Sequence, residues 1–343
     1  MASHLDIVIL EVVMIFRQLF DSTSSTYTYL IASRKGGEAL MIDPVFERTD
    51  HYLRLLEELD LKLVKVVDTH VHADHVSAMA ALRDHTNCVT VMGEQSPVDV
   101  VSMRVSDAEK VTIEGFSMTA MYTPGHTDDS YCFRTDDWVF TGDTLLIRGT
   151  GRTDFQNGDP GLQYESLFDG LLKLPETLLV YPAHDYKGDT VSTLAEEKAF
   201  NPRLQVGSRQ EYVDLMNNLK LANPKMMDVA VPENQRMGLN LERQREVPCV
   251  DADGVISNAD ELYLMVDLRE DGERVKHGVI PNSIHAPYSR LDQHLEMLSH
   301  ASSKQIVFYC AAGERSAMAV KLAGGSGVRD CAHLPGGYEA WVR

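Results

Sequence analysis

One run of seven residues constrains the fold of this chain more than any other feature. Residues 69–75 have the sequence Thr-His-Val-His-Ala-Asp-His, and they follow a β-branched run at residues 63–67. A loop that leaves a strand can bring alternate side chains to one point, and neutral imidazole is a good ligand for iron and zinc. Packing and solvation alone give no reason to gather His70, His72, Asp74 and His75 so closely. We therefore expect a metal site at the end of a predicted strand.

Three later positions repeat this arrangement of a metal-ligating side chain just after a strand. His126 follows a Pro-Gly turn, Asp143 follows Phe-Thr-Gly, and His184 follows Tyr-Pro-Ala. Each residue alone is typical of an ordinary turn. Together with residues 69–75 they give four strand-end sites in one order along the chain, and this order predicts a shared metal centre.

Short apolar runs broken by Gly, Asp and Pro predict the secondary structure of the first two thirds of the chain. Leucines at helical spacing indicate a helix over residues 49–59, and a second helix is expected over 76–84. Strands are expected at residues 26–32, 38–43, 63–67, 89–92, 116–122, 131–134, 138–141 and 178–181. Strands interspersed with helices place this part in the α/β or sheet-sandwich class.

A chain of 343 residues is longer than most single domains, so we expect two. Residues 233–250 are polar, contain Pro248 and lack a clear period, which is typical of a linker. We place domains at 14–237 and 251–343, with the linker at 238–250. In the second domain we expect strands and helices to alternate again: strand 262–267, helix 291–298, strand 305–309 and helix 315–322.

Charge and composition exclude several classes of partner. The chain has 51 acidic against 32 basic residues and a formal net charge of −19, so we expect it to bind neither nucleic acid nor acidic membranes. An anionic substrate would need local Arg or Lys side chains. Five cysteines without a CxxC pair predict free thiols in a reducing compartment. Residues 7–16 are apolar but short and contain Glu11, so no signal peptide is expected, and we expect a cytoplasmic location.

A second candidate site surrounds one of the cysteines. The apolar strand at residues 305–309 ends at Cys310, and the Ala-Ala-Gly-Glu-Arg segment that follows leads almost at once into a helix. Backbone N–H groups in such a loop, and the positive end of the helix, stabilise a thiolate or a persulfide anion. This setting favours a reactive role for Cys310, whereas the other four cysteines lack it.

The ligand segments resemble the metallo-β-lactamase superfamily over roughly residues 14–237. That resemblance implies an αββα sandwich with the metal at one edge of two sheets, and most members bind two zinc ions. Residues 145–156, 181–186 and 201–204 look like the persulfide dioxygenase branch. In some relatives a Cys stands where this chain has Thr150, so redox control through that thiol is not expected here.

The resemblance to persulfide dioxygenases implies one Fe(II) per chain, held by His70, His126 and Asp143. Two His and one carboxylate leave three coordination positions for substrate sulfur and O₂. The implied substrate is glutathione persulfide, oxidised by O₂ to sulfite with return of glutathione. The residues implied to orient the ligands are His72, Asp74, His75 and His184, and those implied to contact the substrate are Arg152, Tyr186 and Arg203, with Arg148 and Lys187 as weaker candidates.

From about residue 251 to its end the chain resembles a rhodanese domain, a smaller α/β fold with a parallel sheet. The matching segments are residues 266–270, 277–284 and 334–341 and the six-residue loop 310–315. The resemblance implies catalytic roles for Cys310 and Arg315, with a Cys310 persulfide that exchanges sulfur between thiosulfate and glutathione. A six-residue loop fits sulfur transfer, whereas longer loops occur in the related phosphatases.

Two alternatives stay open. All seven residues of the predicted metal site would permit a di-zinc thioester hydrolase of the glyoxalase II type, although only about 50 residues separate His184 from the linker, too few for that enzyme's helical glutathione-binding domain. The second domain could also be a non-catalytic sulfur-binding or regulatory module, but inactive domains of this kind commonly lack the loop cysteine. The sequence leaves open the direction of sulfur transfer and whether the chain forms a homo-oligomer.

Overall fold

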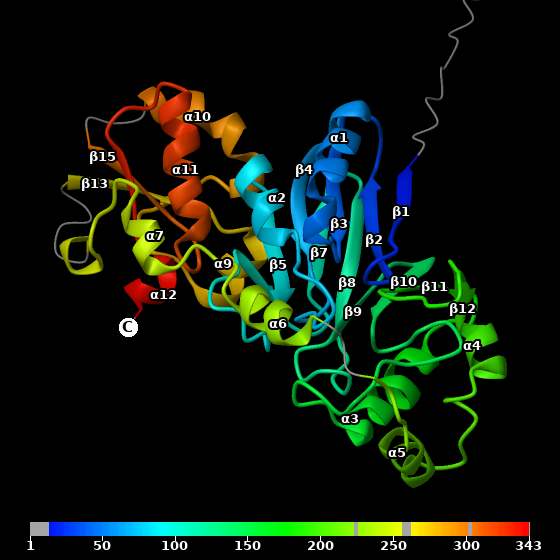
Figure 1. Cartoon of the computed structure of the whole chain (residues 1–343). Coiled ribbons are helices and arrows are strands. Elements are labelled where there is room, and N and C mark those ends of the chain that lie inside the picture. Colours follow the sequence, from blue (N-terminus) through cyan, green and yellow to red (C-terminus); the bar gives the residue numbers. More distant parts are fainter. Residues whose placement is uncertain (1–13, 223–225, 256–261, 301–303, 343) are drawn as a thin grey trace, which may run out of the picture.

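The computed structural model describes residues 14–222, 226–255, 262–300 and 304–342 (Figure 1). Of the apolar run at residues 7–16, residues 7–13 lie outside the described residues. Within them, no helix is long and apolar enough to cross a membrane.

Two six-stranded sheets build the first part of the chain. β2 (Thr26–Ala32) is buried along its whole length, as its aromatic and β-branched residues predict. The first sheet has the order β1 (Ile15–Asp21), β2, β3 (Glu38–Ile42), β4 (Lys62–Val67), β5 (Val89–Gly93), β6 (Met103–Val105). The second has the order β12 (Ser192–Thr193), β11 (Leu179–Pro182), β10 (Trp138–Gly142), β9 (Tyr131–Arg134), β8 (Phe116–Tyr122), β7 (Lys110–Ile113).

The two sheets pack face to face, and helices cover their outer faces. The side chains between the sheets include Ile31, Val67 and Phe133, all fully buried. A second buried cluster lies under α1 (Thr49–Glu58) and α2 (Met79–Thr86), and a third lies under α3 (Pro160–Glu165), α4 (Leu194–Phe200) and α5 (Arg209–Asn217). The expected αββα sandwich is confirmed.

The last part of the chain forms a parallel four-stranded sheet in the order β14 (Ile284–His285), β13 (Tyr263–Asp267), β15 (Gln305–Tyr309), β16 (Cys331–His333). The central strand β15 is a continuous apolar run because both faces of a parallel sheet are covered. The helices of this part are α9 (Asp271–His277), α10 (Leu291–His300), α11 (Glu314–Gly325) and α12 (Gly337–Trp341). The expected parallel α/β domain is confirmed.

The two parts touch over an extended contact. Figure 1 shows α11 and its sheet beside the α2 and β5 side of the first sandwich. Buried side chains between the first two sheets and those on one face of the third sheet belong to one contiguous apolar cluster. Ion pairs also cross the contact, from Lys62 to Asp292 and from Lys276 to Glu94.

Several expected elements need correction. The helix expected over residues 76–84 begins only at Met79, because Ser77 makes a bridge with Val45 and the carbonyl of Val76 accepts a bond from Phe46. The predicted linker is not featureless, since it contains α7 (Leu241–Arg245), capped by the side chain of Asn240. The strands that were not expected are β1, β6, β7, β12, β14 and β16, and the helices that were not expected include α3, α4, α5, α6 (Met227–Gln235), α9 and α12.

Candidate metal centre and sulfur-transfer site

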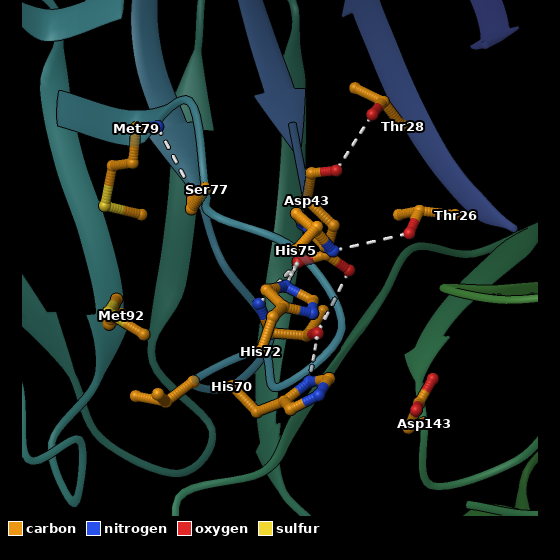
Figure 2. Close-up of polar contacts among 12 residues, drawn as sticks. Thr26, Thr28, Asp43, His70, His72, His75, Ser77, Met79, Met92 and Asp143 are labelled. Carbon is orange, nitrogen blue, oxygen red and sulfur yellow. Dashed lines mark hydrogen bonds and ion pairs between the residues drawn. The ribbon is translucent and has the colours of Figure 1, made fainter. Parts of the chain in front are cut away.

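The predicted metal-site residues come together at one edge of the sandwich. The loop after β4 carries His70, His72, Asp74 and His75, and the loops after β8, β10 and β11 carry His126, Asp143 and His184. In Figure 2 His75, His72 and His70 follow one another from top to bottom along the β4 loop, and Asp143 lies to their right on another segment. The expected convergence of four strand-end segments is therefore present.

One ligand atom from each of His70, His126 and Asp143 lies within 4.8 Å of the other two. The Nε2 atom of His126 is 3.5 Å from Oδ2 of Asp143, and the rings of His70 and His126 meet edge-on with their centroids 5.0 Å apart. These three donors form the two-His-one-carboxylate set that non-haem iron prefers. They also line a cavity of about 700 Å³, so substrate can reach them.

Hydrogen bonds fix the orientation of both imidazoles. The Oγ1 hydroxyl of Thr69 donates to Asp43 at 3.0 Å, so the Nδ1–H of His70 donates to Thr69 at 2.9 Å. The Nδ1–H of His126 donates to the carbonyl of Arg152 at 2.7 Å. In each ring the second nitrogen, Nε2, is then left with its lone pair for a metal. Neither Asp43 nor Thr69 was predicted, although Asp43 also follows directly on a strand.

His184 bridges two carboxylates. Its Nδ1 is 2.6 Å from Asp143 and its Nε2 is 2.9 Å from Asp74. Burial acts to lower the pKa of His184, but the two carboxylates outweigh burial and raise the pKa well above its ordinary value. Burial likewise opposes ionisation of Asp143, yet His184 and the other imidazoles hold the pKa of that carboxyl below its ordinary range. In this position His184 can hold the side chain of Asp143 in one rotamer.

A second group of donors lies beside the first. Ligand atoms of His72, Asp74 and His75 also lie within 4.8 Å of one another. Asp74 bonds to His75 Nδ1 at 2.8 Å, and Asp43 contacts His72 Nε2 at 3.3 Å. The buried atoms His72 Nδ1 and His75 Nε2 have no partner among the described residues. The division of the seven residues into iron ligands and orienting groups therefore stays a prediction.

All three predicted substrate contacts, Arg152, Tyr186 and Arg203, line the cavity. The guanidinium of Arg152 is already paired with Asp154 at 2.6 and 2.7 Å and lies over the ring of Phe155. Among the described residues, the guanidinium of Arg203 donates to the carbonyl and the hydroxyl of Thr150, both of them neutral. Tyr186 is exposed, and its ring is parallel to that of His184.

The two weaker candidates for substrate contact, Arg148 and Lys187, also differ in whether they are paired with a carboxylate. Arg148 is paired with Glu197, whereas no carboxylate of the described residues lies in ion-pair contact with Lys187 or Arg203. Both of these unpaired cations line the cavity. Among the described cavity residues, Arg203 and Lys187 are therefore cations whose charge no carboxylate neutralises.

The Cys310 loop, residues 310–315, begins directly after β15 and runs into the first turn of α11, so the expected strand-loop-helix order is present. Cys310 is fully buried, and the N–H of Gly313 donates to its Sγ at 3.1 Å. The φ angle of Gly313 is +91°, in the left-handed region that favours glycine. Arg315 is also fully buried, where both of its terminal nitrogens bond to Glu273 at 2.7 and 2.6 Å. This pairing fits a role of Arg315 in holding the loop, and its predicted catalytic role stays a prediction.

Two buried residues of the predicted linker and of α6 support these sites but were not predicted. The side chain of Gln244 donates to the carbonyl of Ala312 in the Cys310 loop at 3.0 Å. The side chain of Asn234 donates to the carbonyls of His72 and His75 at 3.0 and 2.9 Å. Nothing in their local sequence marks them, because each acts on a segment far away along the chain.

Comparison with known proteins finds a family for each of the two domains. Residues 22–98 and 93–184 match the family described as "Metallo-beta-lactamase superfamily", and residues 252–343 match "Rhodanese-like domain". The chain is 41% identical over 229 residues to "Persulfide dioxygenase ETHE1, mitochondrial" of Mus musculus, and the match covers 66% of this chain and 89% of that protein.

Two solved structures are similar in fold. The structure of ETHE1 from Myxococcus xanthus is 50% identical, covers 65% of this chain and 98% of its own, and has a TM-score of 0.63. A metallo-beta-lactamase from Staphylococcus aureus subsp. aureus COL covers 94% of this chain and 99% of its own at a TM-score of 0.61, but at 22% identity it shows the fold alone. The chain belongs to the persulfide dioxygenase family, and it is an enzyme of that family with a C-terminal rhodanese-like domain.

Proposed function

We propose that the first domain oxidises glutathione persulfide with O₂ and water to sulfite and glutathione at a single Fe(II). The observation that carries this proposal is the set of two oriented imidazoles and one carboxylate, His70, His126 and Asp143, facing the cavity. Iron bound there would supply neighbouring open positions for the persulfide sulfur and O₂. The name of the mouse relative supports the same reaction.

The residues of the cavity have separate roles in this proposal. His70 and His126 would hold the metal through Nε2, because Thr69 and the Arg152 carbonyl select the tautomer with the proton on Nδ1. Arg203 and Lys187 bind the substrate carboxylates, because their charges are not neutralised by a carboxylate of the described chain. Arg152, already paired with Asp154, shapes the wall with its carbonyl and its stacked guanidinium.

Oxygen uptake with glutathione persulfide, measured together with the metal content of the same sample, tests this function. We expect about one iron per chain and O₂ consumption that yields sulfite. Two zinc ions per chain, thioesterase activity and no O₂ uptake would contradict it. That outcome would favour the glyoxalase II type of hydrolase, which the unpartnered nitrogens of His72 and His75 would suit as ligands of a second metal.

We further propose that Cys310 of the second domain transfers sulfane sulfur. Its thiolate attacks the outer sulfur of thiosulfate, the S–S bond breaks with release of sulfite, and a Cys310 persulfide forms. Glutathione thiolate then takes the outer sulfur and leaves as glutathione persulfide, which restores the Cys310 thiolate. The Gly313 N–H donates to the sulfur at 3.1 Å, and α11 begins at the next residue, so a backbone donor and a helix N-terminus would both favour the anionic form of the sulfur. The reverse direction uses the same groups.

Replacement of the sulfur carrier tests the second activity. Cys310→Ser should abolish thiosulfate:glutathione sulfur transfer and leave O₂ uptake unchanged. Unchanged sulfur transfer in Cys310→Ser would show instead that the second domain is a non-catalytic module.

We also propose that the enzyme works in a reducing compartment, the cytoplasm. The five free cysteines support this proposal.

A further inference from the structure

One residue of the Cys310 loop is tied to the other domain. Glu314 is fully buried, and its carboxylate accepts four hydrogen bonds. One oxygen accepts from Arg83 Nη1 at 2.7 Å and from the backbone N–H of Leu239 at 3.0 Å. The other accepts from the hydroxyl of Thr90 at 3.0 Å and from the hydroxyl of Ser102. Glu314 and these four partners are called the Glu314 anchor.

None of these four donors comes from the rhodanese-like domain. Arg83 belongs to α2, Thr90 to β5, and Ser102 lies just before β6. Leu239 lies in the segment that joins the domains. A carboxylate loses its water on burial and is tolerated there only when charge and hydrogen bonds replace that water. The cation that replaces this water is Arg83 of the first domain. The observed shape of the Cys310 loop therefore depends on the first domain.

The anchor lies close enough to the reactive sulfur to affect it. Glu314 follows Gly313 directly, and the Gly313 N–H is the backbone donor to Cys310 Sγ. The side chain of Gln244 in α7 donates to the carbonyl of Ala312, the residue before Gly313. The same side chain packs against Gly313 itself, because a Cβ on Gly313 would lie 2.1 Å from Oε1 of Gln244. The loop is thus held from outside on both sides of Gly313. A shift of Glu314 would move the N–H that stabilises the sulfur anion.

We propose that Arg83 and Glu314 are positioning residues for sulfur transfer, through which the metallo-β-lactamase domain holds the Cys310 loop in its active shape. This inference rests on the proposed sulfur transfer at Cys310. It differs from a simple contact between domains, because a contact would affect stability alone. A positioning pair affects the rate at each correctly folded site.

The experiment compares full-length Arg83→Met and Glu314→Gln with wild type and with Lys62→Met. Lys62 is the matched control, because it also forms an ion pair across the two domains, with Asp292, but both of its partners are exposed. Active sites are counted as the fraction of Cys310 that carries a persulfide at saturating thiosulfate, read by mass spectrometry. Rates at varied thiosulfate then give KM and, after division by the number of active sites, kcat per active site.

We expect kcat per active site to fall about 10- to 100-fold in both anchor variants, since small displacements of positioned groups cost this much. KM for thiosulfate should change less than kcat, and Lys62→Met should behave as wild type. O₂ uptake at the metal centre should stay unchanged in all three variants. The proposal is overturned if kcat per active site in both anchor variants stays within about twofold of wild type.

Two further measurements keep the test decisive. The double variant Arg83→Met/Glu314→Gln should be no slower than the slower single variant, because residues that act as a unit are not additive; multiplied losses would contradict a shared role. If an anchor variant does not fold, judged by its circular dichroism, Ser102→Ala removes one neutral donor and takes its place under the same criterion.

Failure of the proposed function gives a different result from failure of the anchor. If wild type forms no Cys310 persulfide, the sulfurtransferase proposal fails. The anchor is then read from the rate at which iodoacetamide alkylates Cys310. A faster rate in the anchor variants than in both wild type and Lys62→Met supports the anchor, and equal rates in all four proteins overturn it.

Discussion

At the scale of single residues, the role of each metal-site histidine depends on the partner of its second nitrogen. His70 and His126 donate one N–H to Thr69 and to a backbone carbonyl, which leaves the other nitrogen for a metal. His184 has a carboxylate at each nitrogen. We therefore predict that the same side chain serves as ligand in two places, at His70 and His126, and as orienting group in a third, at His184.

The predicted ligands can be tested separately from the sulfur-transfer site. His126→Ala or Asp143→Ala should abolish iron binding and O₂ consumption, because each removes one of three protein donors. Sulfur transfer should be retained. Metal analysis and O₂ uptake check this, with His51→Ala as a control, since His51 is exposed on α1. Loss of both activities would show that the metal centre supports the second domain as well.

Another buried histidine makes stability depend on pH. Burial lowers the pKa of His333 below its ordinary value of 6.5, although bonds to the backbone of Gln244 and Leu334 oppose the shift. Below pH 6.5 the unfolded chain therefore binds a proton at His333 more readily than the folded chain does. The contribution of His333 to stability is thus present above pH 6.5 and is lost as the pH falls below that value. The contribution belongs to the neutral ring, which bonds to the Gln244 carbonyl at 2.9 Å.

Urea unfolding from about pH 8 to about pH 5 measures this contribution. Wild type should lose stability toward acid more steeply than His333→Gln. The exposed His85 provides the control, and His85→Gln should keep the wild-type slope. Equal slopes for wild type and His333→Gln would show that His333 does not take up the proton.

At the scale of elements, the segment after β10 shapes the metal centre by close backbone packing. The N–H of Gly151 donates to the carbonyl of Asp143 at 2.6 Å, and the next residue accepts the His126 Nδ1–H. The side chain of Gln156 then donates to the carbonyl of Val71 in the His70 loop at 2.8 Å. This segment, which continues the Asp143 loop, thus contacts two of the other three ligand loops.

Gly151→Ala should lower iron affinity about 10- to 100-fold, the usual cost of disturbing groups that orient ligands. A Cβ at this position would lie 2.2 Å from the Asp143 carbonyl and 2.7 Å from His126 Nδ1. Gly149→Ala is the matched control in the same segment, because its Cβ would only touch Leu146 at 3.8 Å. Iron competition with a chelator gives the affinities; similar values for the two variants would show that the segment yields without cost.

At the scale of the whole molecule, the buried contact between the domains has a measurable effect on stability. The side chains of Arg83 and Glu314 are 1% and 0% exposed, whereas those of Lys62 and Asp292 are 58% and 62% exposed. Arg83→Met leaves a buried carboxylate without its cation and should lower the free energy of unfolding by about 3–5 kcal/mol. Lys62→Met should lower it by less than about 1 kcal/mol.

Equilibrium unfolding in urea of the full chain measures both values. Equal losses in Arg83→Met and Lys62→Met would contradict the buried contact, because exposure is the difference between the two pairs. Glu314→Gln extends the test from the other side. It should also be destabilised, since the Arg83 cation then lacks its nearest carboxylate in the second domain.

Much of the fold was predictable because its signals are local. Aromatic and β-branched runs gave β2, β8, β9 and β15 with the observed bounds. The short β6 and β12 were not expected, because two or three residues carry no periodic signal. The alternating burial of β7 (Lys110–Ile113) shows that a signal was present there and was missed.

The sequence by itself determined the chemical inventory of the two sites. His, Asp and Cys side chains directly after strands predict where a metal and a sulfur atom can be held, because strand-end residues emerge at the edge of a sheet whatever the rest of the chain does. Only the tertiary structure decided which groups hold these residues in place. Asp43, Asn234, Gln244 and Glu314 act through hydrogen bonds to segments remote in sequence. Such bonds form only where folding brings a buried donor and acceptor within about 3 Å, and no local pattern records that distance.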